Sequence, residues 1–335
     1  MEIKMNLGDN SYPIIIKNKG LCEVEKYFDL QRKVLIITDE NVPVSYACAV
    51  KEKCREGYIV TLPSGEGTKS FLHLQMLLKV MTEKGFSRKD AVVSVGGGVI
   101  GDLGGFCASC YMRGVDFYNV PTTTLSQIDS SIGGKCAINF EGIKNIIGAF
   151  YQPKAVLVDI ELLKSLDKRQ IDSGLTEAAK MAATFDEELF RLFETEDIYE
   201  NLEKIIIRSL ELKKDVVEKD EKETGLRKVL NFGHTIGHGI EAYFEGKYTH
   251  GECVGSGMLY MSSDSVRERI RRVLDKLNAP SIDKFDTNVV SKLVSLDKKS
   301  NSNGISCVWV EKIGEFQFKN FTSEEIKKLL EDGIL

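Results

Sequence analysis

Histidine occurs four times in this chain of 335 residues, and three of the four lie between residues 234 and 250. His234 and His238 are four residues apart, which puts both side chains on one face of a helix. His250 follows a turn at Gly246 and can close over that face. The grouping favours a metal site over two helix histidines satisfied by hydrogen bonds. The spacing leaves open which of the three histidines are ligands.

A second candidate is the glycine turn Gly96-Gly97-Gly98-Val99-Ile100-Gly101-Asp102, which follows an apolar run and opens a stretch of small residues. Such a turn lets the backbone approach a pyrophosphate, and the helix that follows offers free N–H groups. Its glycine spacing differs from the G-x-G-x-x-G fingerprint. Nucleotide binding and a packed strand-to-helix turn are therefore both open readings.

Basic residues in otherwise mixed or apolar text form a third set: Lys135, Lys144 beside Asn145, Lys180, Lys213 and Arg227. Lys180 follows Glu177 by three residues, so the two side chains can meet on one helix face. Taken singly, each cation is typical of a solvated surface. Together with the glycine turn and the histidines, they indicate a pocket for an anionic, oxygen-rich substrate.

The first half of the chain predicts a parallel sheet with helices on both faces. Apolar runs at 34–37, 58–62, 91–95 and 117–120 each end in polar or glycine-rich text, and residues 70–84 between them have a helical pattern. Ligands of such sheets bind beyond the carboxyl ends of the strands, where the Gly- and Asp-bearing loops lie.

The second half predicts a mainly helical domain. Helical periodicity runs through residues 187–193, 202–217, 254–277 and 323–330, and strand-like text is confined to 304–310 and 316–318. We therefore expect a Rossmann-like α/β domain over residues 1–160 and a helical domain over residues 161–335.

Composition excludes several function classes. The net charge is −5 with acids and bases mixed, which argues against nucleic acid or a basic membrane surface as a partner. We find no secretory or membrane-spanning apolar run. Eight scattered cysteines are then expected to be reduced in a cytoplasmic protein. Cys107 and Cys110 form a C-x-x-C inside a small-residue helix, which favours packing over redox chemistry.

Two long segments carry a family resemblance. Residues 96–153 read GGGVIGDLGGFCASCYMRGVDFYNVPTTTLSQIDSSIGGKCAINFEGIKNIIGAFYQP, and residues 227–252 read RKVLNFGHTIGHGIEAYFEGKYTHGE. Both resemble the 3-dehydroquinate synthase family of sugar phosphate cyclases, and the resemblance covers nearly the whole chain, in register from Asp39 to the stretch Asp297-Lys298-Lys299. The resemblance implies an N-terminal NAD-binding α/β domain and a C-terminal helical domain that holds a divalent metal, zinc or cobalt.

The resemblance also implies site residues. The metal ligands would be Glu177, His234 and His250, which moves His238 to the substrate side. The NAD contacts would be Asp39, Asn41, Glu66, Lys69, Gly98, Val99, Ile100, Gly101, Asp102, Thr122, Thr123 and Ser165. The substrate-binding residues would be Arg113, Asp129, Lys144 and Asn145. The catalytic residues would be Lys135, Lys180, Lys213, Arg227, Asn231, His238 and one lysine of the pair Lys298-Lys299, with Lys298 preferred.

The implied reaction converts 3-deoxy-D-arabino-heptulosonate 7-phosphate to 3-dehydroquinate and phosphate in the shikimate pathway, a carbon–oxygen lyase reaction. NAD would take hydride from C5 while the metal polarises the C4 and C5 oxygens. Phosphate would then leave, the hydride would return, and ring opening and an aldol closure would form the carbocycle. The family also implies a homodimer in which Arg113 reaches a neighbouring subunit's site.

Two other enzyme classes share this architecture. A sister cyclase such as 2-deoxy-scyllo-inosose synthase or a sedoheptulose 7-phosphate cyclase would lack the carboxylate pocket that Lys180, Lys213, Arg227 and Asn231 indicate. A metal- and NAD-dependent alcohol or glycerol dehydrogenase would need neither those cations nor the segment Asp129–Lys135. A third reading, a binding protein without catalysis, would predict lost metal ligands, but Glu177, His234 and His250 are all present.

Overall fold

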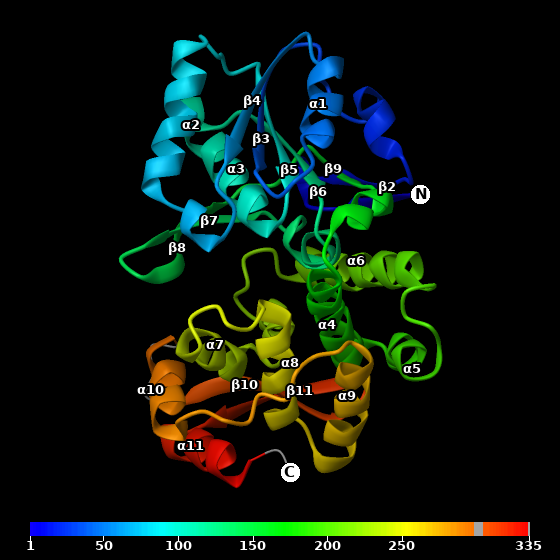
Figure 1. Cartoon of the computed structure of the whole chain (residues 1–335), viewed down its shortest axis with the longest axis vertical. Helices are drawn as coiled ribbons and strands as arrows, with labels where there is room; N and C mark the ends of the chain where they lie inside the picture. The colour runs from blue at the N-terminus through cyan, green and yellow to red at the C-terminus, as the bar shows by residue number, and fades with distance from the viewer. Residues whose placement is uncertain (298–303, 334–335) are drawn as a thin grey trace. The chain divides into compact units, whose positions relative to one another are not determined.

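A computed structural model describes residues 1–297 and 304–333 of the chain (Figure 1). The chain divides into two compact units, Met1–Asp167 and Lys168–Leu335. The division falls after Asp167 rather than after residue 160, because the short helix η6 (Ile160–Ser165) contributes Leu162 to the core of the first unit. Lys298 lies outside the described residues.

The first unit, which is described throughout, is built on a seven-stranded sheet of order β1-β2-β9-β6-β5-β3-β4. Only β1 runs antiparallel to its neighbour, and the other pairings are parallel. This confirms the predicted parallel α/β sheet. The strands are β1 (Glu2–Met5), β2 (Tyr12–Ile16), β3 (Lys33–Asp39), β4 (Glu56–Leu62), β5 (Ala91–Gly96), β6 (Asp116–Pro121) and β9 (Ala155–Val158).

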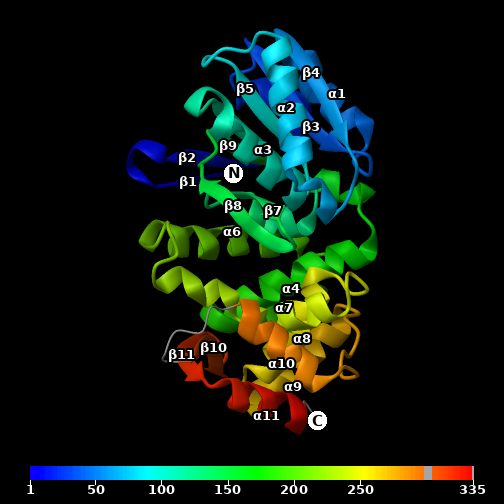
Figure 2. The ribbon, with the colours of Figure 1, turned by 90° about the vertical axis from the view of Figure 1, so that its left-hand side faces the viewer.

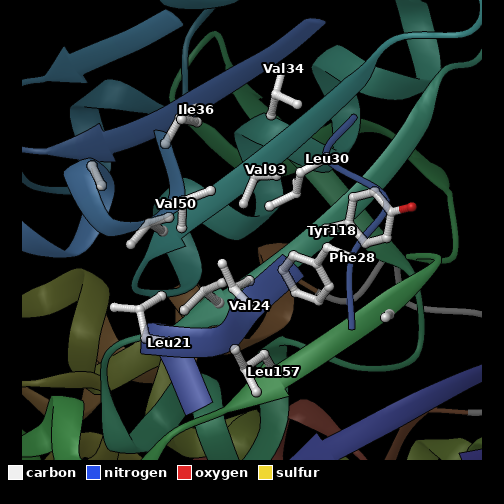
Figure 3. Packing of buried hydrophobic residues seen from close by; sticks show 14 of the residues in the cluster. Leu21, Val24, Phe28, Leu30, Val34, Ile36, Val50, Val93, Tyr118 and Leu157 are labelled. Carbon is white, nitrogen blue, oxygen red and sulfur yellow. The ribbon is translucent and has the colours of Figure 1, made fainter. Parts of the chain in front are cut away.

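Alternation along β3 explains why both faces of the sheet are covered. Val34 and Ile36 enter one apolar cluster, whereas Leu35 and Ile37 enter another on the opposite face. Figure 3 shows Val34, Ile36, Phe28 and Tyr118 among the side chains of the first cluster. The first cluster includes residues of α1 (Val44–Lys53), and the second includes residues of α2 (Phe71–Glu83) and α3 (Gly98–Cys110).

The carboxyl ends of β3, β5 and β6 bring the predicted cofactor loops to one edge of the sheet. These strands are adjacent and parallel, so Asp39, the glycine turn before α3, and Thr122 follow neighbouring strand ends. Thr122 N donates to Gly96 O at 2.9 Å, which ties two of the loops together. This edge is where open α/β sheets bind ligands.

An antiparallel hairpin that the sequence did not predict also belongs to this unit: β7 (Lys135–Phe140) and β8 (Ile143–Phe150). It carries Lys135, Lys144 and Asn145, and Figure 1 shows it as a separate ribbon outside the large sheet. The remaining short helices of the unit are η1 (Gly8–Asn10), η2 (Gly20–Lys26), η3 (Glu66–Thr68), η4 (Tyr111–Arg113) and the π-helix η5 (Ser126–Ser130).

The described part of the second unit is mainly helical, as predicted. Its helices are α4 (Lys168–Phe185), α5 (Glu187–Thr195), α6 (Leu202–Lys219), η7 (Leu226–Asn231), α7 (His234–Tyr243), α8 (His250–Tyr260), α9 (Asp264–Lys276), α10 (Thr287–Asp297) and α11 (Ser323–Asp332). A two-stranded sheet, β10 (Ile305–Lys312) and β11 (Glu315–Phe321), accompanies them. Of the described helices, none has the length and apolar character needed to cross a membrane.

The single helical run predicted over residues 254–277 is wrong. It consists of α8 and α9, separated at residues 261–263. Ser262 forms a bridge with Val310 of β10, and Ser263 N donates to Val310 O at 3.1 Å. These backbone contacts with a distant strand replace helical hydrogen bonds, and a periodicity of side chains does not reveal them.

Helices α7 and α8, which carry the three clustered histidines, approach closely enough to exclude side chains between them. A Cβ atom on Gly257 would lie 2.0 Å from Gly233 O, and one on Gly237 would lie 2.9 Å from Cys253 O. Figure 2 shows α7, α8 and α10 packed together. Glycine at these positions therefore sets the separation of His234 and His238 from His250.

We predict that Gly257→Ala destabilises the protein by about 2 kcal/mol, since two backbones cannot rotate away from the added methyl group and the clash exceeds the gain in helix propensity. Urea unfolding followed by far-UV circular dichroism measures the change. Gly67→Ala is the matched control, because a Cβ there meets nothing within 4 Å. Equal stability of the two variants would contradict the proposed constraint.

Candidate functional site

Glu177 is the most deeply buried charged residue of the predicted site, with an exposed fraction of 0%. It lies on α4 three residues before Lys180, whose exposed fraction is 1%. Lys180 Nζ is 2.5 Å from Glu177 Oε2, the ion pair that the i,i+3 spacing predicted. Neither carboxylate oxygen accepts a well-aligned hydrogen bond from the described residues.

The histidines gather on the other oxygen of this carboxylate. His234 Nε2 lies 3.7 Å and His250 Nε2 lies 3.5 Å from Glu177 Oε1. His234, His238 and His250 each have a ring nitrogen within 4.8 Å of the other two. These three side chains can therefore hold a metal ion by themselves. The structure thus brings together both the set that the spacing indicates and the set that the resemblance implies.

Burial and neighbouring charge shift these groups in different directions. Burial lowers the pKa of His234 to about 3, against a smaller opposing effect from Glu177. Burial also acts to lower the pKa of His250, but its contacts with Glu177 and Glu241 outweigh this and raise it to about 10. Burial acts to raise the pKa of Glu177, yet Lys180, His234 and His250 bring it well below the usual value. Glu177 is therefore an anion at neutral pH.

The ring of His250 is held from its other side. Glu241 Oε2 lies 3.0 Å from His250 Nδ1, which directs Nε2 toward Glu177. His250 begins α8, whose N-cap Thr249 forms a capping box with Glu252. The guanidinium group of Arg169 on α4 donates a hydrogen bond of 2.7 Å to each carboxylate oxygen of Glu252. Helix α4 therefore fixes both Glu177 and the start of the helix that carries His250.

Two further predicted cations are buried in this unit, Lys213 on α6 at 5% exposure and Arg227 on η7 at 1%. Asp220 organises the loop before Arg227, accepting from the N–H groups of Thr224 at 2.9 Å, Gly225 at 2.7 Å and Arg227 at 2.9 Å. Arg227 Nη1 itself donates to Glu221 O. Since α6 contacts α4 and η7, both cations lie on elements packed around α4.

In the first unit, the glycine turn leaves no room for side chains where the predicted cofactor residues lie. A Cβ atom on Gly98 would lie 2.9 Å from Ser130 Oγ, and one on Gly97 would lie 3.0 Å from Thr123 Cγ2. The first N–H groups of α3, at Gly98, Val99 and Ile100, have no partner within the helix. Together with the helix dipole they suit an anionic group such as a pyrophosphate.

Lys69, whose exposed fraction is 4%, contacts three other predicted residues of the first unit. Its Nζ lies 2.7 Å from Asp102 Oδ2 and 3.5 Å from Glu66 Oε1, and it donates to Asn145 Oδ1. Burial acts to lower the pKa of Lys69, but Asp102 and Glu66 outweigh it and raise the pKa above its usual value. Residues implied to contact NAD thus touch one implied to contact substrate.

The other predicted residues of the first unit take separate places. Asn41 N donates to Asp39 Oδ1 at 2.9 Å, and burial raises the pKa of Asp39. Ser165 Oγ donates to Leu162 O at 2.9 Å. The remaining positions are Arg113 in η4 with φ 69°, Asp129 in η5, Lys135 at the start of β7 and Lys144 in β8.

The comparisons with known proteins agree with one another. Residues 59–173 match the model described as 3-dehydroquinate synthase N-terminal, and residues 174–300 match the one described as 3-dehydroquinate synthase C-terminal. A curated relative from Clostridium beijerinckii, a 3-dehydroquinate synthase, is 41% identical over 94% of this chain and 96% of its own length. The chain belongs to the 3-dehydroquinate synthase family.

Solved structures show the same fold as this 3-dehydroquinate synthase family member. A 2-deoxy-scyllo-inosose synthase complexed with carbaglucose-6-phosphate, NAD+ and Co2+ is 24% identical, with a TM-score of 0.88, over 99% of this chain and 100% of its own. A 2-epi-5-epi-valiolone synthase from Streptomyces hygroscopicus with NAD+ and Zn2+ is also 24% identical, with a TM-score of 0.87, over 98% of each chain. At this identity the likeness concerns the fold alone.

The structure adds two carboxylates that sequence reasoning missed in this family member. Glu241 lies three residues after His238 on α7, so helical spacing was a usable signal. Glu223 Oε1 accepts from Asn231 Nδ2 at 3.0 Å. No signal separates Glu223 from the neighbouring Glu218, Asp220 and Glu221 in a uniformly charged stretch.

We predict that Asp220→Asn weakens the protein most at neutral pH. Hydrogen bonds from backbone N–H groups lower the pKa of Asp220 from its usual 3.8 to about 2, and the bond from Arg227 N has the largest effect. Because the pKa of Asp220 is lower in the folded protein than in the unfolded chain, its ionised carboxylate stabilises the fold at any pH above about 4. This stability is lost as the pH falls from about 4 to about 2. Thermal unfolding of both proteins at pH 7, 5, 4 and 3 should show a gap in midpoint that narrows with acidity.

Asp215→Asn, on the exposed face of α6, is the control and should show a smaller gap. A gap for Asp220→Asn that stays constant down to pH 3 would contradict the assignment of this stability to the ionised carboxylate.

Proposed function

We propose that this chain is a 3-dehydroquinate synthase, a lyase that converts 3-deoxy-D-arabino-heptulosonate 7-phosphate to 3-dehydroquinate and phosphate. The observation that carries the proposal is the match to a curated relative of this activity over nearly the whole length of both chains. The buried cluster of Glu177, Lys180, His234 and His250 gives the match a chemical basis. A cytoplasmic location and a homodimer stay predictions.

The donor set of the second unit fits a divalent metal held by Glu177, His234 and His250. Ligands about 2.0–2.1 Å from a tetrahedral zinc lie about 3.3 Å apart. The observed separations of 3.7 and 3.5 Å from Glu177 Oε1 to the two Nε2 atoms are close to this value. Oε2 is meanwhile engaged by Lys180, and Glu241 orients His250 from outside. Zinc or cobalt suits such nitrogen and oxygen donors.

The strand-end loops of the first unit fit NAD. The N-terminus of α3 supplies N–H groups for the pyrophosphate, and Asp39, Glu66, Lys69, Asp102, Thr122, Thr123 and Ser165 supply polar groups around the same edge. When bound, NAD provides a temporary hydride acceptor, and the metal ion polarises the hydroxyl groups of the substrate. The net reaction consumes no NAD.

The chain's own side chains then hold the substrate's anionic ends and move protons. Arg227 has the planar fork that suits a carboxylate, and Lys213 adds a second buried positive charge. The family resemblance also assigns Lys135, Lys144 and Asn145 of the β7–β8 hairpin to the substrate. His238 offers a ring nitrogen beside the metal ligands for proton transfer. These anion-binding groups favour this cyclase over a dehydrogenase of neutral alcohols.

The proposal is tested by turnover. We predict that protein loaded with zinc and sub-stoichiometric NAD releases phosphate from the heptulosonate phosphate and forms dehydroquinate without NADH build-up. Phosphate, product and absorbance at the NADH wavelength are followed together. Accumulation of NADH in proportion to turnover would instead identify a dehydrogenase.

Sedoheptulose 7-phosphate and glucose 6-phosphate, which lack the carboxylate, are the matched comparison substrates. We expect them to be turned over far more slowly, because they lack the carboxylate that would accept charge-assisted hydrogen bonds from the guanidinium group of Arg227. Comparable turnover of either sugar would place the chain among the sister cyclases.

We predict that the two competing metal sets differ in mutagenesis. His250→Ala should lower zinc content sharply, because a site with three protein ligands loses one. His238→Ala should retain zinc and lose activity. Zinc content by inductively coupled plasma spectrometry after dialysis distinguishes them. Zinc lost from His238→Ala but kept by His250→Ala would favour the histidine spacing over the proposed Glu177 set.

A further inference from the structure

The β7–β8 hairpin contains an irregularity at the residues proposed to bind substrate. Ile138 pairs with Ile147 and Phe140 pairs with Ile143, so the register shifts between these two pairs. Between them, Asn139 of β7 faces three residues of β8, Lys144, Asn145 and Ile146. Bulges of this kind redirect side chains next to functional sites. Lys144 and Asn145 therefore lie on a bulge.

Asn139 connects that bulge to the loop before α2. Its Oδ1 accepts from Asn145 N at 2.8 Å, and its Nδ2 donates to Glu66 Oε1 at 2.9 Å. Its backbone N–H donates to Lys69 O at 2.8 Å. One side chain thus bonds the bulge and the loop of Glu66 and Lys69 at the same time. All of these atoms belong to the first unit.

The conformation of Asn145 explains why the bulge needs such support. Its φ is 56°, in the left-handed region that asparagine enters more readily than most other residues with a side chain. The hydrogen bond from its N–H to Asn139 Oδ1 and the one that its own Oδ1 accepts from Lys69 hold it there. The two hydrogen bonds therefore select this conformation from the several that an asparagine can adopt.

We infer that Asn139 is a positioning residue, which holds Lys144 and Asn145 of the bulge in their substrate-binding arrangement and ties them to Glu66 and Lys69. This inference rests on the proposed function, since it concerns the binding of the same sugar phosphate. Asn139 acts through Asn145 and through the loop of Glu66, and neither the histidine spacing, the glycine turn nor the family resemblance pointed to it.

The test compares Asn139→Ala with a variant in which donor and acceptor are exchanged. Asn139→Ala removes the side-chain hydrogen bonds with Asn145 N and Glu66 Oε1, together with a longer one of 3.3 Å to Glu66 O. Combining Asn139→Asp with Glu66→Gln restores the two shorter bonds, because the carboxylate still accepts from Asn145 N and now also accepts from the glutamine amide. Glu66→Gln alone is the reference for the exchange. Asn320→Ala, an exposed asparagine of β11, is the control.

We expect Asn139→Ala to raise the KM for the heptulosonate phosphate about tenfold, as the loss of a positioning hydrogen bond would. Its Kd for NAD, from isothermal titration calorimetry, should stay within about threefold of wild type, because Glu66 and Lys69 keep their own ion pair. The exchange variant should have a KM within about threefold of Glu66→Gln alone. Asn320→Ala should match wild type.

Three results would overturn the inference: a KM of Asn139→Ala within twofold of wild type, an exchange variant as impaired as Asn139→Ala, or an NAD Kd that rises in parallel with KM. A general loss of fold would lower the thermal midpoint and NAD binding together. Wild-type protein that releases no phosphate refutes the proposed function before any variant is compared, so the two failures are distinguishable.

Discussion

A carboxylate without solvent exposure requires positive charge within a few ångströms, and Glu177 imposes that requirement on the helical unit. Its own helix supplies Lys180 one turn later, and α7 and α8 supply two histidines at the other oxygen. These helices can do so only because Gly257 lets α8 approach the start of α7. The packing of the unit and the electrostatics of its candidate metal site therefore depend on the same contacts.

The first unit meets a different constraint, which is to present backbone and polar groups at one edge of a sheet. Side chains are absent where the chain must approach closely, as at Gly98, and a buried cation is placed where the acidic groups converge, at Lys69. Asp102 lies in α3, Glu66 begins η3 and Asn145 lies in β8, so one ammonium group joins three elements. The edge is thus held by charge as well as by the sheet.

The sequence predicted features that depend on local pattern or residue type. The strands β3 to β6, the helices α2, α5, α6 and α11, the Glu177–Lys180 pair and the gathering of histidines all follow from spacing. The features that it missed depend on contacts between distant segments. The break between α8 and α9 needs Val310, and the bulge opposite Asn139 needs the loop of Glu66. Only the family resemblance links Glu177 to the histidines, because His234 lies 57 positions further along the chain, too far for a local spacing to show the contact.

The buried charges of the second unit narrow the kind of substrate. Asp172 and Glu252 are neutralised by Lys168 and Arg169, which remain partly exposed, and Glu177 is neutralised by Lys180 and the histidines. Lys213 and Arg227 add positive charge to this interior, and a divalent ion at Glu177 would add more. Buried cations of this kind suit an anionic ligand better than a neutral polyol, because an anion accepts charge-assisted hydrogen bonds from them. A sugar phosphate that also carries a carboxylate meets this requirement, whereas an alcohol or glycerol does not.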